Sequence, residues 1–304
     1  MNNFVGVLGS LVLVASLSGC ALQSGAEGGD AAKEQVGETT ELGILGPPWI
    51  YNTASWSQGH AAVKLAPFAS TICVLTRVTG KFSGTGEYIS VYHDAANWYL
   101  GGGSQQSGVG GEATCFMRSN MHTNGNTFAV SADTGAFGRG ISGCNGSATL
   151  LGNGTSVAVL NGIQGQMAGS GEYLQVDQAT TSVGTNSVSA HSCSTYDYGF
   201  ADSFTFDSTK VPSFMRPDGS TGDVDVVAAQ TVNDTIGSVV LGPTAQSFCY
   251  FSYIQGGFYG NGEYVQIRSE TLSNGQNYWV LRAGRGAASS YVGAGARCVA
   301  RDQR

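Results

Sequence analysis

Hydrophobic and polar positions alternate in short runs along this chain, and the period of two predicts strands rather than helices. Apolar residues occupy every second position after a recurring Glu-Tyr pair, as in Ile89-Ser90-Val91. Runs of β-branched and aromatic residues precede the pair, at 72–78 and 248–254. Further strands are expected around Trp98 and Trp279. A period of two is typical of a strand with one buried face, so the fold class is all-β.

One phrase occurs three times: GKFSGTGEYISV at 80–91, GQMAGSGEYLQV at 165–176 and GGFYGNGEYVQI at 256–267. Its acids, Glu87, Glu172 and Glu263, stand 85 and 91 residues apart, which is the length of small modules rather than of solenoid turns. We therefore predict three tandem antiparallel β modules, sandwich- or barrel-like, while a single continuous sheet shared between modules stays open as the alternative. The predicted boundaries are 42–123, 124–208 and 209–304.

The phrase is interpreted first as a glycine-rich turn between two strands of each module. Its glycines, Gly86 among them, are expected to supply positive φ or close backbone approach. The three glutamates are expected to accept hydrogen bonds from turn amides. A role in binding a cation or a sugar hydroxyl stays open as the second interpretation. The middle module is expected to be degenerate, with 180–183 in place of the strand that carries Trp in the other two.

Six cysteines remain in an exported chain once Cys20 is set aside, and an even number favours disulfides. Matching positions in the first and third modules pair Cys73 with Cys115 and Cys249 with Cys298. In the middle module, where Ala158 replaces the first cysteine, Cys144 and Cys193 are the expected pair. Each module would thus be closed by one disulfide.

The start of the chain, MNNFVGVLGSLVLVASLSGC, has the apolar core of a signal peptide. Its end, Leu17-Ser18-Gly19-Cys20, resembles the lipobox of bacterial lipoproteins. The resemblance implies a signal peptide at 1–19, lipidation of Cys20, anchoring in a membrane and, with Ala21 next, sorting to the outer membrane. Residues 20–41 are expected to form a flexible tether, because they have no hydrophobic period and are rich in acids.

Composition adds that charged residues are scarce, at 12%, and that the formal net charge is −7. An acidic chain without a basic stripe is not expected to bind nucleic acid. Arginines nevertheless gather in the last module. We interpret Arg282, Arg285 and Arg297 either as a solvated sheet edge or as an anion-binding patch.

Motifs for nucleophilic, nucleotide-dependent or zinc-dependent catalysis do not occur, and the histidines lack ligand spacing, so we expect no enzyme, cofactor or metal site. The aromatic side chains favour binding instead. The candidates for stacking on a sugar ring are Trp49, Trp56, Trp98 and Trp279, although the last two also fit a core role because they recur in register. Two hypotheses follow: a lipid-anchored surface protein that binds or adheres to glycan or an envelope protein through repeated weak sites, and a structural envelope lipoprotein without a small-molecule ligand.

Overall fold

The computed structural model contains strands, turns and bends and no helix among the residues that it describes, in agreement with the all-β prediction. All of these residues fall within one unit of the chain, Gly37–Arg304. The described residues are 50–106, 108–117, 130–137, 146–150, 156–167, 169, 171–179, 187–193, 198–205, 214–215, 221–222, 230–233, 237–260, 262–284 and 291–300. The predicted leader, tether and module boundaries lie outside them.

Six strands surround each copy of the repeated phrase. The first set is β1 (Ile50–Ser57), β2 (Val63–Pro67), β3 (Thr71–Thr79), β4 (Tyr88–His93), β5 (Asn97–Gly103) and β6 (Gly110–Met117). The second set is β7 (Val130–Phe137), β8 (Gly146–Leu150), β9 (Ser156–Gln164), β10 (Tyr173–Ala179), β11 (Ser187–Cys193) and β12 (Tyr198–Thr205). The third set is β15 (Gln230–Asn233), β16 (Ser238–Pro243), β17 (Ser247–Gly256), β18 (Tyr264–Thr271), β19 (Asn277–Gly284) and β20 (Val292–Ala300), while β13 (Phe214–Met215) and β14 (Thr221–Gly222) pair separately.

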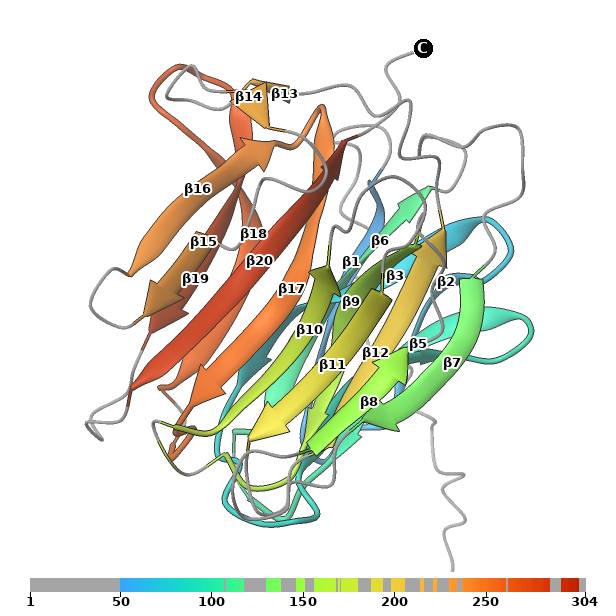
Figure 1. The fold of residues 1–304 in the computed structure, drawn as a ribbon, viewed down its shortest axis with the longest axis vertical. Coiled ribbons are helices and arrows are strands. Elements are labelled where there is room, and N and C mark those ends of the chain that lie inside the picture. Colours follow the sequence, from blue (N-terminus) through green and yellow to red (C-terminus); the bar gives the residue numbers. More distant parts are fainter. Residues whose placement is uncertain are drawn as a thin grey trace, which may run out of the picture. The chain divides into compact units, whose positions relative to one another are not determined.

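The eighteen strands of these sets form three six-stranded antiparallel sheets among the described residues (Figure 1). The strand orders are β1-β6-β3-β18-β19-β16, β2-β5-β4-β9-β12-β7 and β15-β20-β17-β10-β11-β8. Each sheet takes three strands from one set and three from another. Tandem modules with sheets of their own were expected, whereas every sheet here is shared between two sets. The sets meet at the middle of each sheet, at three junctions: β3 with β18, β4 with β9, and β10 with β17.

The repeated phrase joins the strand sets to one another through its backbone. Phe82, Met167 and Phe258 form a closed ring of three hydrogen bonds: Phe82 N donates to Phe258 O, Phe258 N to Met167 O, and Met167 N to Phe82 O, at 2.8–2.9 Å. All three side chains are fully buried. The phrase is therefore more than a local turn, because the backbone of each copy forms hydrogen bonds with the backbones of the two other copies.

The first glycine of each phrase has the left-handed backbone conformation that favours this residue type. The φ angles of Gly80, Gly165 and Gly256 are 105°, 112° and 112°. A Cβ on Gly80 would lie 2.2 Å from the carbonyl oxygen of Gly108. Gly86 instead has open space where a Cβ would stand and no positive φ, so the expectation that Gly86 needs this conformation was wrong. The constraint belongs to the glycine that ends the preceding strand.

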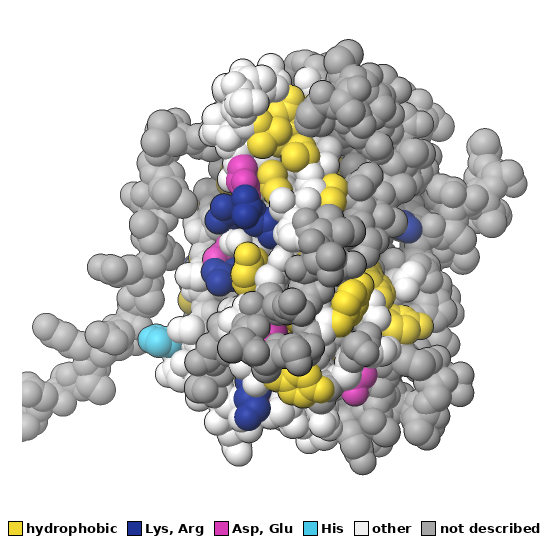
Figure 2. Space-filling model, turned by 90° about the vertical axis from the view of Figure 1, so that its left-hand side faces the viewer, with side chains coloured by type: hydrophobic (Ala, Val, Ile, Leu, Met, Phe, Trp, Pro, Cys, Tyr) yellow, Lys and Arg dark blue, Asp and Glu magenta, His cyan; other side chains and the backbone are white. Residues whose placement is uncertain are grey.

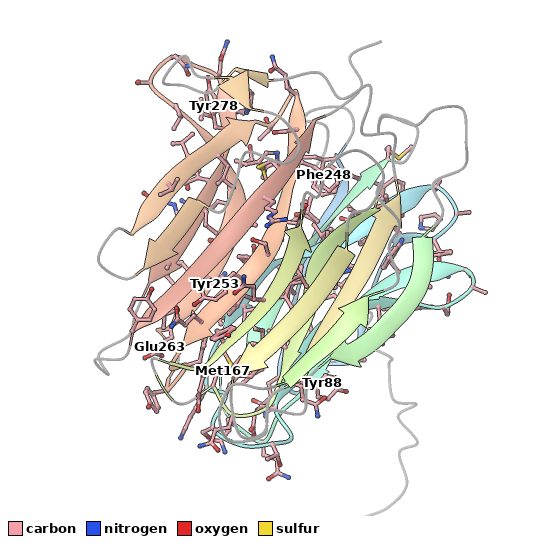
Figure 3. The ribbon with its side chains drawn as sticks, viewed as in Figure 1. Tyr88, Met167, Phe248, Tyr253, Glu263 and Tyr278 are labelled. Carbon is pink, nitrogen blue, oxygen red and sulfur yellow. A yellow bond between two sulfur atoms is a disulfide. The ribbon has the colours of Figure 1, made fainter. Side chains whose placement is uncertain are left out.

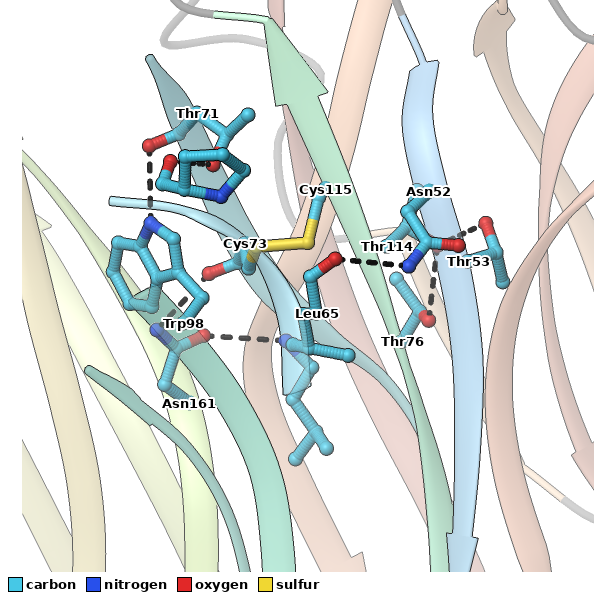
Figure 4. Close-up of a disulfide and its surroundings, with 12 residues drawn as sticks. Asn52, Thr53, Leu65, Thr71, Cys73, Thr76, Trp98, Thr114, Cys115 and Asn161 are labelled. Carbon is cyan, nitrogen blue, oxygen red and sulfur yellow. Dashed lines mark hydrogen bonds between the residues drawn. A yellow bond between two sulfur atoms is a disulfide. The ribbon is translucent and has the colours of Figure 1, made fainter. Parts of the chain in front are cut away.

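Two of the three predicted disulfides are confirmed, Cys73–Cys115 (Figure 4) and Cys249–Cys298. Each joins residues directly opposite one another in a strand pair, β3 with β6 and β17 with β20. The position that matches them in the second set pairs Ala158 with Ser203. Cys193 stands elsewhere, opposite Tyr173 in β11, and Cys144 lies outside the described residues, so the third bridge stays a prediction.

The tryptophans of β5 and β19 belong to the core. Trp98 is fully buried and Trp279 is 2% exposed, and their indole nitrogens donate to the carbonyls of Thr71 and Ser247 at 3.0 and 2.7 Å. The matching strand of the second set is β11, at 187–193 rather than 180–183. Its register places Val188 where the other sets have tryptophan. Val188 lies opposite Gln178, and Trp98 lies opposite His93, which is the residue of the first set that matches Gln178.

A bulge recurs on the third strand of each set and buries a polar residue in the core. Thr76, Asn161 and Ser252 are the residues inserted at these bulges, and all are buried. Asn161 accepts a hydrogen bond from Leu75 N at 3.2 Å and donates to Cys73 O at 3.4 Å (Figure 4). The amide thus fills the gap that the bulge leaves in the ladder of β3.

Candidate functional site

A row of small residues crosses the solvent-facing side of the sheet that contains the β4–β9 junction. Ser90 lies opposite Gly101 of β5 on one side and opposite Gly162 of β9 on the other. A Cβ on Gly101 would come within 2.9 Å of the Ala62 side chain, so Ala62, just before β2, continues the row. Side chains at these positions are too short to fill the surface, and a depression results.

Tyrosines on β4 rise on both sides of this row. Tyr88 and Tyr92 flank Ser90 two residues away in each direction, on the same face of the strand. They are 36% and 38% exposed and belong to the few large hydrophobic side chains of the described residues that reach the surface. Tyr92 stacks on Tyr99 with centroids 5.5 Å apart and planes at 21°. Tyr88 lies across Gly103, whose Cβ would be 2.7 Å from a carbon of the ring.

The depression between these walls has a volume of about 570 Å³. We call it the trough; it is lined by His60, Ala61, Ala62, Tyr88, Ser90, Val91, Tyr92, Gly101 and Gly102. One end is formed by the turn between β1 and β2. Gly59, which belongs to this turn, has a φ of 89°. The indole of Trp56 donates to the carbonyl of His60 at 3.0 Å and holds this turn in place. Trp56, a predicted ligand residue, is itself 4% exposed and acts as a support.

The floor of the trough carries a hydroxyl with no partner among the described residues. Ser90 is 7% exposed, and its side chain makes no hydrogen bond to any of them. Its hydroxyl oxygen opens into the trough rather than being sealed from solvent, so it can bond to water or to another partner there. A ligand with hydroxyl or carbonyl groups in the trough would supply that partner.

The rim of the trough is almost neutral. Asp94, beyond Tyr92, accepts hydrogen bonds at 2.7 Å from the backbone amides of Asn97 and Ala96 and at 3.0 Å from the Tyr99 hydroxyl. The Asn97 amide is the main cause that lowers the pKa of Asp94. Burial is the main cause that raises the pKa of Tyr92, and Tyr88 raises it further. Tyr92 therefore stays a neutral hydrogen-bond donor throughout the physiological range.

The β3–β18 junction has side chains at the matching register positions, and they fill it. Arg77 stands where the trough has Gly162, and Gln266 stands where it has Ser90. Arg77 Nη1 contacts Glu112 Oε1 at 2.8 Å, and Gln266 Nε2 donates to Glu112 Oε2 at 2.9 Å. The Arg77 guanidinium also lies over the ring of Tyr264, the counterpart of Tyr88, 5.7 Å from its centroid.

The β10–β17 junction is occupied by tyrosine. Tyr253 stands at the position of Gly162, and its ring lies 5.8 Å from that of Tyr173 with the planes tilted by 39°. The hydroxyl of Tyr253 donates to Gln255 Oε1. Burial raises the pKa of Tyr253. Tyr88 and Tyr253, which belong to different junctions, lie well apart in Figure 3.

The glutamates of the phrase face their own turns. Glu172 Oε2 accepts a hydrogen bond from Gly169 N at 2.7 Å, as expected for a turn acceptor. Glu87 and Glu263 are 4% and 0% exposed, and their carboxylates lie against Gly84 and Gly260, which hold the place of Gly169. Glu87 Oε2 and both carboxylate oxygens of Glu263 have no hydrogen-bond partner among the described residues, so the expectation of a bond from a turn amide was wrong for Glu263. The structure does not bring the three acids together, and no group of three or more His, Cys, Asp or Glu that fits a metal occurs in the described part of the chain.

The predicted arginine patch is not formed as a single rim. Arg282 on β19 and Arg297 on β20 belong to different sheets, and Arg285 lies outside the described residues. Arg282 Nη2 donates to Glu270 Oε2 at 2.6 Å, and Arg268 Nε donates to Glu270 Oε1 at 2.7 Å. Basic and acidic side chains also lie side by side on the face shown in Figure 2. Arg282 is therefore neutralised by its own sheet rather than available to an anion.

Of the predicted tryptophan ligands, none that the structure describes reaches solvent. Trp56, Trp98 and Trp279 are buried, and Trp49 lies outside the described residues. The tyrosines of the trough were missed. Their signal was present in the repeated phrase, where Ser90 is short while its counterparts, Gln175 and Gln266, are long.

Together these features define an antiparallel β protein with a tyrosine-walled trough at one of three matching sheet junctions. Comparison with known proteins found no matching family model, no matching curated protein and no matching solved structure. Within the part of the chain that the structure describes, no helix is long and apolar enough to cross a membrane.

Proposed function

We propose that this chain is a lipid-anchored bacterial envelope protein that binds carbohydrate, without catalysis, in the trough. The observation that supports carbohydrate is the trough itself: two exposed tyrosine rings flank the Ser90 hydroxyl, which opens into the trough and bonds to none of the described residues. Ligand sites combine apolar and aromatic walls with a few placed polar groups, and this surface has that composition. Adhesion to a glycan of a neighbouring surface is the role that a tethered protein of this kind would serve.

The architecture that we propose is three tandem repeats of six strands, arranged so that each repeat shares its sheets with the other two. The repeated phrase would hold the repeats together at its ring of backbone hydrogen bonds. The middle repeat would be closed by Cys144–Cys193. Although repeated weak sites were expected, the two other junctions are filled by their own side chains, which favours one carbohydrate site in each chain.

The anchor rests on the lipobox resemblance and is tested separately from binding. Replacing Cys20 by Ser should release the protein from the outer-membrane fraction or leave it as an uncleaved precursor. A substituted protein that is processed and fractionates like the unmodified one would contradict the anchor.

Binding is tested with the full-length protein on an array of neutral and acidic glycans. We expect a signal for the unmodified protein and its loss in Ser90→Gln, because glutamine is the residue that fills the closed β3–β18 junction. The matched control is Gln266→Ser, which changes the equivalent position outside the trough and should keep the signal. Binding that survives Ser90→Gln would move the site elsewhere, and a blank array would favour the structural role that is the alternative hypothesis.

A further inference from the structure

The row of small residues on the floor of the trough runs across the strands rather than along them. Ala62 beside β2, Gly101 of β5 and Ser90 of β4 line the trough, and Gly162 of β9 is the next position of the row in the sheet register. Four neighbouring strands are separated by three spacings of about 4.8 Å, so the row is about 14 Å long. That length exceeds a single hexose ring, and the shape is a channel rather than a cup.

The two walls of this channel follow the same direction. On one side, sheet register aligns Lys64, Tyr99 and Tyr92 across β2, β5 and β4. On the other side it aligns Gly103, Tyr88 and Gln164 across β5, β4 and β9. Rings therefore flank the channel at successive points of its length, and a ligand that follows the channel would meet them in turn.

The channel meets the turn between β1 and β2 at the margin of the sheet. β2 is the last strand of its sheet, and His60 and Ala61 of that turn line the trough beside Ala62. Ala61 and Ala62 are exposed and have short side chains. A larger side chain at position 62 would therefore narrow the channel at this end.

The polar groups along the channel fit a neutral ligand. Ser90 offers a hydroxyl on the floor, and Gln164, whose Nε2 donates to Thr85 O at 3.5 Å, stands beside Tyr88 in the sheet register. Of the charged side chains near the rim, Lys64 carries a positive charge and Asp94 a negative one, and the two offset each other. An anionic ligand would find no cluster of cations among the described residues of the trough.

We propose that the trough takes a stretch of a linear, neutral polysaccharide whose chain axis crosses the strands. This inference rests on the proposed carbohydrate-binding function and adds the class of the ligand and its direction. Ser90 would donate to or accept from a sugar hydroxyl of this stretch. Tyr88 and Tyr92, on opposite walls at β4, would contact the same part of it from two sides, and Tyr99 on β5 would contact the neighbouring part.

The test uses the full-length protein and oligosaccharides of one to six units from linear glucans, xylans and mannans, with acidic oligosaccharides of the same lengths beside them. Affinity for at least one neutral series should rise tenfold or more between one and three units and then level off. Ala62→Leu, which narrows the channel beside β2 at an exposed position, should remove most of that rise. Thermal unfolding of this variant should match that of the unmodified protein.

The other outcomes distinguish a failure of the channel proposal from a failure of the proposed carbohydrate-binding function. Equal affinity for the single sugar and the longer chains would overturn the channel and leave carbohydrate binding standing. A preference for the acidic series would overturn the neutral class. Absence of binding to every glycan would overturn the proposed function, and the channel with it.

Discussion

The β4–β9 and β3–β18 junctions have the same backbone pairing, but side chains fill the surface of the β3–β18 junction and leave a trough at the β4–β9 junction. In the closed junction, Arg77 and Gln266 both bond to Glu112, and the Arg77 guanidinium lies over Tyr264. In the open junction, glycine and serine at the matching positions leave Tyr88 with a free face above a trough. The same backbone pairing can therefore occur at several junctions, while two small residues, Ser90 and Gly162, make one of these junctions a candidate binding surface.

The closed junction also shows what the open one lacks. Its ion pair is partly exposed, with Arg77 and Glu112 side chains at 35% and 23%, so its contribution to stability is small. The loss of such a pair at the open junction costs the fold little, because the backbone ladder and the core beneath it are kept. Function and stability can thus be separated by substitution.

The largest effect is expected where both junctions depend on the same backbone. The amides of Gly80 and Gly165 donate to the carbonyls of Glu263 and Glu87 across the closed and open junctions. Gly80→Val should lower the free energy of unfolding by about 2–4 kcal/mol, because it combines backbone strain with overlap on Gly108. Urea unfolding measures this change. Gly86→Val is the control, and an equal loss in both variants would contradict the assignment of the strained glycine.

The next effect separates the junctions by binding. Tyr88→Ala and Tyr92→Ala should each weaken glycan binding about tenfold, which corresponds to about 1.4 kcal/mol, because each removes a wall of the trough. Tyr264→Ala, at the closed junction, should leave the affinity unchanged. Calorimetric titration of the three variants gives the comparison. A loss in Tyr264→Ala as large as that in Tyr88→Ala would mean that the two junctions do not differ in function.

A smaller effect is expected when the closed junction is opened. The double substitution Arg77→Gly and Gln266→Ser copies the residues of the open junction onto β3 and β18. It should cost at most about 1 kcal/mol of stability, since an exposed ion pair contributes little. It should also expose Tyr264 to quenching of its fluorescence by added acrylamide. Collapse of the fold would show that the network stabilises the junction far more than its exposure implies.

The smallest effect concerns acid. Hydrogen bonding from Arg282, with a further bond from Arg268, lowers the pKa of Glu270 on β18. A lowered folded-state pKa stabilises the fold above the unfolded value, and that contribution is lost as the pH falls through the folded one. Glu270→Gln should therefore reduce the decline in stability below about pH 4.5 without changing glycan binding. Unfolding curves that keep the same slope against pH would contradict this role.

The sequence was sufficient to predict the strands because their alternation is local. It also predicted Cys73–Cys115 and Cys249–Cys298, since recurrence at matching positions marks them. The sharing of sheets was not predictable in this way, because it depends on pairing between strands far apart, such as Ser90 with Gly162. For the same reason the trough was missed.

The tryptophans show a second limit. Trp98 and Trp279 recur in register, and recurrence fits a core role as well as a ligand role until burial is known. In the middle set Val188 takes their place, and no residue type marks it as the counterpart. Burial and register are properties of the whole sheet, and they decide which aromatic residues can meet a ligand.

The central claim is that the open junction, alone among the three, binds the ligand, and tyrosine footprinting tests it most directly. Hydroxyl-radical oxidation of the full-length protein would be measured by mass spectrometry with and without the glycan that binds best. Tyr88 and Tyr92 should be protected by the glycan, whereas Tyr51 and Tyr259, which are exposed elsewhere at 47% and 42%, should be oxidised as before. Protection of Tyr259 or Tyr264 with Tyr88 and Tyr92 unchanged would contradict the account.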